Sequence, residues 1–150
     1  MDNSKQHPAQ RELDRFLRSI SDRLRELFET VRYEEALKKL EDAKEPSPEW
    51  IASQLRSLRV KARTIRAAVS ELAETTDMLL KRYIDAGGTD ALRIAHAREE
   101  LLFLQKTLED QAVQSVRLEQ LGQNTALLRK QKNLLDALEV EQFRRKLGTP

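Results

Sequence analysis

Residues 48–90 of the chain are PEWIASQLRSLRVKARTIRAAVSELAETTDMLLKRYIDAGGTD, and they contain the most regular pattern in the sequence. Apolar side chains recur there mostly at steps of three and four, which places them on one face of an α-helix. Pro46-Ser47-Pro48 supplies a helix start and Gly87-Gly88 a helix stop. We therefore expect one long helix over residues 48–85. Its apolar face comprises Ile51, Leu55, Leu58, Ala62, Ile65, Val69, Leu72, Leu79 and Tyr83.

The segments on either side of this stretch also have helical spacing. In residues 9–44 an apolar stripe runs from Leu13 to Val31, and from Tyr33 onward the stripe moves to roughly the opposite side of a straight helix. This change of phase favours a break near residue 31. A third helix is expected over residues 89–147, and the pattern leaves open whether it is continuous through Gly122.

These segments predict an all-α fold. We expect a helical bundle or an antiparallel coiled-coil hairpin of long helices, with an additional N-terminal helix or helix pair. Residues 9–147 would form a single all-helical domain. Residues 1–8 and 148–150 would be tails, the first of them disordered.

The composition agrees with helices and narrows the classes of function. Charged residues make up 35% of the chain and aromatic residues 5%, a mixture typical of bundles and coiled coils. The 27 basic and 25 acidic side chains leave a net charge of +2, so no overall field attracts a polyanion. Cysteine is absent, and no apolar stretch is long enough to span a bilayer. The polar first ten residues predict that there is no signal peptide. We expect a cytoplasmic protein without membrane insertion.

The unequal lengths of the second and third helices predict an exposed end. If they fold back on each other at Gly87-Gly88, roughly the last 20 residues of the third helix extend past the second. Exposed apolar stripes of this kind mark surfaces for a partner or for self-association. We expect protein binding and homo-oligomerisation there, through Leu134, Leu135, Leu138 and Phe143.

A second candidate surface is a ridge of arginines at steps of three and four. No acidic residue interrupts the sequence from Ser53 to Ser70. The ridge fits salt bridges to an acid-bearing helix, and with less support it fits an anion site that contacts successive phosphates. The second interpretation would make the chain a nucleic-acid-binding or nucleic-acid-complex subunit. The ridge comprises Arg56, Arg59, Arg63 and Arg66.

Catalytic and metal-binding motifs have little support in the sequence. His96 precedes Glu99 and Glu100, but a di-iron helix motif needs Glu three residues before the histidine, and Arg93 occupies that position. The sequence contains no phosphate-binding loop and no serine or cysteine nucleophile arrangement. We therefore predict no cofactor and a non-enzymatic helical protein-interaction module: a scaffold, an adaptor or a secretion-type chaperone.

Overall fold

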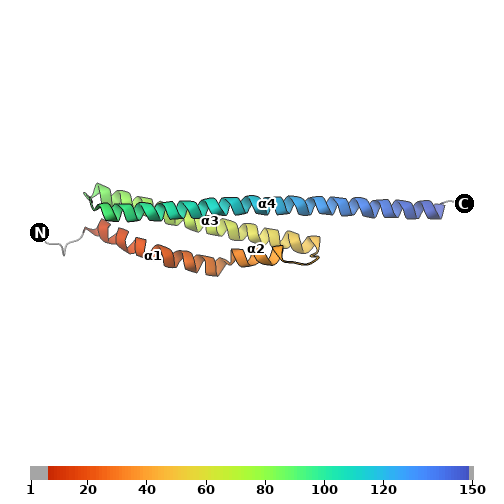
Figure 1. Cartoon of the computed structure of the whole chain (residues 1–150), viewed down its shortest axis with the longest axis horizontal. Coiled ribbons are helices and arrows are strands. Elements are labelled where there is room, and N and C mark those ends of the chain that lie inside the picture. Colours follow the sequence, from red (N-terminus) through yellow and green to blue (C-terminus); the bar gives the residue numbers. More distant parts are fainter. Residues whose placement is uncertain (1–6, 149–150) are drawn as a thin grey trace.

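The computed structural model describes residues 7–148, except for the side chain of Leu128. Four helices follow one another: α1 (Pro8–Val31), α2 (Tyr33–Glu41), α3 (Pro48–Asp85) and α4 (Ala91–Gly148). The described residues confirm the predicted all-α, bundle-like fold. α3 and α4 form an antiparallel hairpin, and α1 and α2 lie along it (Figure 1). Of the predicted N-terminal tail, residues 1–8, only His7 and Pro8 are among the described residues. His7 caps α1, and Pro8 is its first residue.

The boundary between α1 and α2 is a single residue in the left-handed conformation. Arg32 has φ 53° and ψ 45°, and its N–H donates to the carbonyl of Phe28 at 2.9 Å. A non-glycine residue pays a steric penalty there, of about 1–3 kcal/mol. The break rotates α2 relative to α1. The apolar stripe of α1 and the apolar stripe of α2 therefore both face α3. Their buried members are Leu13, Leu17, Ile20, Leu24, Tyr33, Leu37 and Leu40.

α3 forms the centre of the bundle, because it contacts α1, α2 and α4. Ser47 caps its start, with the side-chain oxygen accepting from the N–H of Trp50 at 3.1 Å. The apolar face expected from the sequence is buried along most of its length. Residues of α4 that face it are buried at every seventh position, namely Ala97, Leu104, Gln111 and Leu118. This repeat is typical of a coiled-coil seam.

The turn between α3 and α4 requires both of its glycines. Gly87 has φ 89°, and the N–H groups of Gly87 and Gly88 donate to the carbonyls of Ile84 and Tyr83. Those two bonds form a Schellman cap. A Cβ on Gly88 would overlap the Tyr83 ring, so only glycine allows the turn to pack so closely there. Asp90 caps α4 by accepting from the N–H groups of Leu92 and Arg93.

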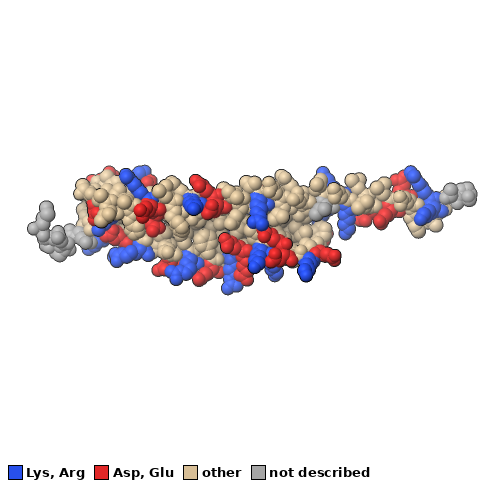
Figure 2. All heavy atoms as spheres, in the orientation of Figure 1, with Lys and Arg blue, Asp and Glu red and all other residues tan. Residues whose placement is uncertain are grey.

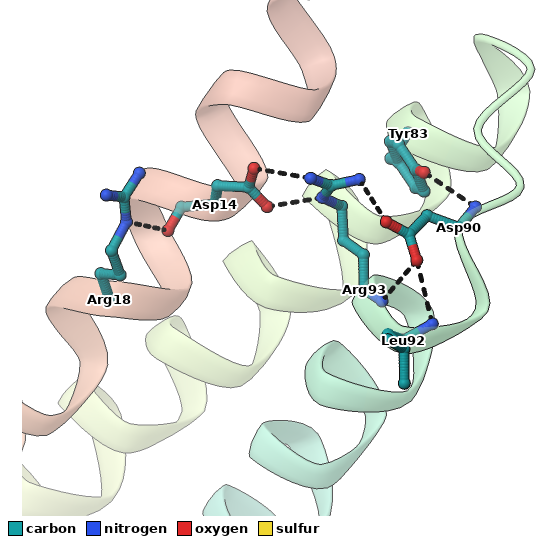
Figure 3. A network of polar contacts seen from close by, with 6 residues as sticks. All are labelled: Asp14, Arg18, Tyr83, Asp90, Leu92 and Arg93. Carbon is teal, nitrogen blue, oxygen red and sulfur yellow. Dashed lines mark hydrogen bonds and ion pairs between the residues drawn. The ribbon is translucent and has the colours of Figure 1, made fainter.

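The same end of the molecule is held by a network around Arg93 (Figure 3). The guanidinium donates to both carboxylate oxygens of Asp14 on α1, at 2.7 and 3.1 Å, and to Asp90 at 3.0 Å. The hydrogen bond with Asp14 raises the pKa of Arg93 above its ordinary value. A further bond runs from the N–H of Asp90 to the hydroxyl of Tyr83 at 3.1 Å. α1 is thus attached to the closed end of the hairpin.

Candidate protein-interaction surfaces

The C-terminal part of α4 extends beyond the rest of the bundle (Figure 1). α3 begins level with Arg129, whose Nη2 lies 3.6 Å from Oε1 of Glu49. From there α4 continues for about 20 residues, a rise of about 30 Å. Every side chain described in residues 126–148 is exposed. We call residues 126–148 the overhang.

All four apolar residues predicted to contact a partner lie in the overhang. The exposed fractions of Leu134, Leu135, Leu138 and Phe143 are between 55% and 65%. At about 100° per residue, Leu134, Leu135 and Leu138 fall within about 100° around the helix axis. Phe143 is nine residues from Leu134, which places it about 180° away. Phe143 is only eight residues from Leu135, about 80° away, so it lies at the edge of the leucine stripe nearest Leu135, where Val140 and Leu147 are its neighbours.

Charges along the overhang alternate in blocks (Figure 2). Nearest the bundle the block is basic, the middle block is acidic, and the block at the end of α4 is again basic. An arrangement of this kind distinguishes parallel from antiparallel pairing of two copies. The three blocks consist of Arg129, Lys130 and Lys132; Asp136, Glu139 and Glu141; and Arg144, Arg145 and Lys146.

The arginine ridge lines a groove between α3 and α4. Two hollows of about 500 Å³ and 260 Å³ share Arg59 and together extend from Ser115 to Asn133 along α4. We call them the open groove. Its floor is apolar or small, and includes Ala52, Leu55, Ala62, Leu118, Gly122 and Ala126. All four predicted ridge residues, Arg56, Arg59, Arg63 and Arg66, are among its lining residues.

The open groove faces away from α1 and α2. Lys61 on α3 donates to the carbonyl of Val31 at the end of α1, and Arg117 on α4 pairs with Glu41 on α2. A residue two positions from Lys61 or Arg117 is rotated by about 200° around the helix axis, which is about 160° measured the other way, and so points to nearly the opposite side. Arg59 and Glu119 are such residues. The face of the α3–α4 pair opposite α1 and α2 is therefore uncovered.

Two ridge arginines reach across the open groove to α4. Nε of Arg59 lies 4.0 Å from Oε1 of Glu119, and Nη2 of Arg66 donates to Oγ of Ser115 at 2.9 Å. A Cβ on Gly122 would lie 3.1 Å from Nη2 of Arg59, so the missing side chain lets the guanidinium lie against α4. Gly122 therefore has a packing role. It does not interrupt α4, which answers the question that the sequence left open.

Positive charge predominates along the open groove. Six cationic side chains line it, and Glu119 is the one carboxylate among the lining residues of the two hollows. Arg56 and Arg63 have no ion pair within the described part of the chain. Unpaired guanidinium groups next to an apolar floor can bind carboxylates or phosphates. The cationic residues are Arg56, Arg59, Arg63, Arg66, Arg129 and Lys130.

Other parts of the described surface give weaker candidates. A hollow of about 780 Å³ lies beside the break between α1 and α2, where Arg32 is 3.8 Å from the carboxylate of Glu35. His96 Nε2 lies 3.5 Å from Oε1 of Glu100. Within residues 7–148 no group of three His, Asp or Glu side chains is placed to hold a metal ion. No helix in this part of the chain is long and apolar enough to cross a membrane.

Comparison of the chain with models of protein families, with curated proteins and with solved structures found no match. The overhang and the open groove are the two features of the chain that indicate a function.

Proposed function

We propose that this chain is a non-enzymatic helical protein-interaction module, acting as a scaffold, an adaptor or a secretion-type chaperone, and that it self-associates through the overhang. The observation that supports this proposal is the exposure of the overhang. A helix of about 20 residues that projects into solvent is marginal by itself, because most helical stability comes from a packed apolar face. Its exposed leucines gain stability when another helix covers them.

A second copy of the chain fits the overhang in one direction. If two overhangs pair antiparallel about an axis between Leu134 and Leu135, the basic block 129–132 of each copy lies beside the acidic block 136–141 of the other. Parallel pairing in register would place each block beside the same block of the other copy, where like charges repel. In the antiparallel arrangement Gln131 faces Leu138 of the other copy. The charges therefore favour the antiparallel pairing, in which Leu134 of each copy faces Leu135 of the other.

The interface should be weak. Two helices pairing over about 20 residues form an interface near or below the lower end of the range for specific complexes, about 1,200 Å² in total. An association of this size suits an adaptor that exchanges partners. We expect a reversible dimer in the micromolar range, at about −8 kcal/mol.

Sedimentation equilibrium of the full chain tests the proposal. We expect wild type to show a concentration-dependent mass that approaches twice 17.4 kDa. The variant Leu134→Glu/Leu138→Glu should remain at the monomer mass, because it places four carboxylates in the interface.

The matched control is Leu92→Glu/Leu102→Glu. These leucines are 82% and 65% exposed on α4 within the bundle, and the variant changes the net charge equally. It should associate as wild type does. A wild-type chain that stays monomeric at all concentrations, or a control that dissociates as fully as the overhang variant, would contradict self-association through the overhang.

A further inference from the structure

We propose that the open groove binds an amphipathic helix of another protein, one with a narrow apolar edge and carboxylates on its flanks. This site shares Ala126, Arg129, Lys130 and Asn133 with the overhang but includes none of Leu134, Leu135, Leu138 and Phe143, and it does not depend on self-association. A helix bound there would lie on the face of the α3–α4 pair opposite α1 and α2, and would complete a four-helix arrangement.

The dimensions of the open groove fit a helix. Its lining residues on α4 run from Ser115 to Asn133, a rise of about 27 Å. That length corresponds to about five helical turns. The floor is built from small side chains, with Ala52 and Ala62 on α3 and Gly122 and Ala126 on α4. Small residues between two helices allow a third helix to approach closely and to insert its larger side chains.

The charges specify the flanks of that helix. Six cations and one carboxylate line the open groove, so an acidic helix is attracted and a basic helix is repelled. The arginines on α3 recur at steps of three, four and three over about 15 Å. Carboxylates at the same steps on a neighbouring helix would be level with Arg56, Arg59 and Arg63. Each arginine can then form a bidentate pair.

Two other occupants fit less well. The overhang of a second copy has six basic and three acidic side chains, so its net positive charge is repelled by the ridge. A nucleic acid would match the cations, but its bases would meet an aliphatic floor without an aromatic side chain among the lining residues to stack upon. Glu119 would also face the phosphates.

The binding experiment uses the full chain and a fluorescently labelled synthetic helical peptide of about 20 residues. One face of the peptide has alanine and leucine, and both flanks have glutamate at steps of three and four. A matched peptide has lysine in place of every glutamate. A single-stranded oligonucleotide with the same net charge as the acidic peptide is the third probe. By fluorescence anisotropy at physiological salt, we expect binding of the acidic peptide only.

Two variants locate the site. Arg59→Glu/Arg63→Glu should weaken binding of the acidic peptide about tenfold or more, because two attractions become repulsions. The control Arg11→Glu/Arg15→Glu makes the same charge change on exposed positions of α1 and should bind as wild type does. Ala126→Tyr fills the floor without a change of charge and should also weaken binding. Ala95→Tyr, exposed near the closed end of the hairpin, should not. Far-UV circular dichroism establishes that all four variants are folded.

Several results would overturn the proposal. Equal affinity for the acidic and basic peptides, absence of binding, or unchanged binding by the ridge variant would each exclude a charge-selective helix site. Tighter binding of the oligonucleotide would identify the open groove as a nucleic-acid site. Conversion of the ridge variant to a monomer would identify a second copy as the occupant. Leu134 and Leu138 do not line the open groove. The variant Leu134→Glu/Leu138→Glu should therefore bind the acidic peptide as wild type does, even if it no longer self-associates.

Discussion

The ammonium group of Lys61 on α3 donates a 2.7 Å hydrogen bond to the carbonyl of Val31, the last residue of α1. Carbonyl groups in the last turn of a helix have no partner within that helix. At this break, Arg32 turns the chain away, and Lys61 supplies the missing donor from a neighbouring helix. Lys61 lies within the basic stretch of α3, yet its role differs from that of the arginines on either side of it.

Replacing Lys61 with methionine should therefore destabilise the fold. The substitution keeps an apolar side chain but leaves the half-buried carbonyl of Val31 without this donor. We expect the free energy of unfolding to fall by about 1–2 kcal/mol. Arg63→Met is the matched control, because Arg63 is an exposed cation two residues away and should lose less than about 0.5 kcal/mol. Urea denaturation of both variants compares them, and equal losses would contradict a specific role for Lys61.

The contact between Asp14 and Arg93 should contribute more than the surface ion pairs. Their side chains are 27% and 19% exposed and are joined by two parallel hydrogen bonds. A double-mutant cycle with Asp14→Asn and Arg93→Gln should give a coupling free energy of about 1–2 kcal/mol. The same cycle for Asp77 and Lys81, which are mostly exposed on α3 and 2.9 Å apart, should give about 0.3–0.5 kcal/mol. Similar values for the two pairs would show that α1 is not attached through Arg93.

The two glycines of the turn should respond differently to alanine. Gly87→Ala should lower the free energy of unfolding by about 1–2 kcal/mol. Its positive φ is the only cause, because a Cβ there would lie in open space. Gly88→Ala should cost about 1–3 kcal/mol because its Cβ meets the Tyr83 ring. Tyr83→Leu should relieve the second cost and not the first. In denaturation experiments the Gly88 and Tyr83 substitutions should thus be less than additive, whereas Gly87 and Tyr83 should be close to additive.

Much of the fold could be predicted from the sequence, because helix periodicity and caps are local signals. The phase change between Val31 and Tyr33 falls where Arg32 breaks the helix. Its left-handed conformation had no local signal, since neither glycine nor proline is present there. The overhang follows from the unequal lengths of α3 and α4. The network around Arg93 joins residues 79 positions apart, and no local pattern indicates which helices meet.

The candidate sites were predicted in part. The spacing of the ridge arginines indicated one helix face, but it could not show that α1 and α2 leave this face uncovered. That depends on the packing around Lys61 and Arg117. Helix geometry places Leu134 and Phe143 at opposite edges of the apolar surface of the overhang, because nine residues correspond to half a rotation beyond two full turns. The predicted use of these residues in partner binding stays a prediction.

Tyr33 should give the protein a component of instability at alkaline pH. Its side chain is 2% exposed, and its hydroxyl has no hydrogen-bond partner among the described residues. Burial raises the pKa of Tyr33 above its ordinary value, while Arg117 opposes this shift. The folded state therefore holds the proton more tightly than the unfolded state. The stability associated with this difference is complete below pH about 10 and is lost as pH rises through the folded-state pKa.

Tyr33→Phe should consequently be neutral or stabilising by up to about 1 kcal/mol at neutral pH, because no hydrogen bond is lost. Above pH about 10 its advantage over wild type should widen. Tyr83→Phe is the control: it loses the bond from Asp90 and should be destabilised by about 1 kcal/mol at neutral pH. Urea denaturation at neutral pH and above pH about 10 measures the free energy of unfolding of each variant. If wild type and Tyr33→Phe differ in that free energy by the same amount at the two pH values, ionisation of Tyr33 does not contribute.

The antiparallel register proposed for two overhangs can be tested by cross-linking, because the wild-type chain contains no cysteine. An axis between Leu134 and Leu135 brings residue 131 of one copy beside residue 138 of the other. A mixture of Gln131→Cys and Leu138→Cys chains should therefore form a disulfide-linked heterodimer faster than either chain forms a homodimer. In a parallel pair each position would face itself, and the homodimers would form faster. Gln131→Cys mixed with Leu92→Cys, which lies far along α4, measures the background from random collisions and should form no excess of heterodimer.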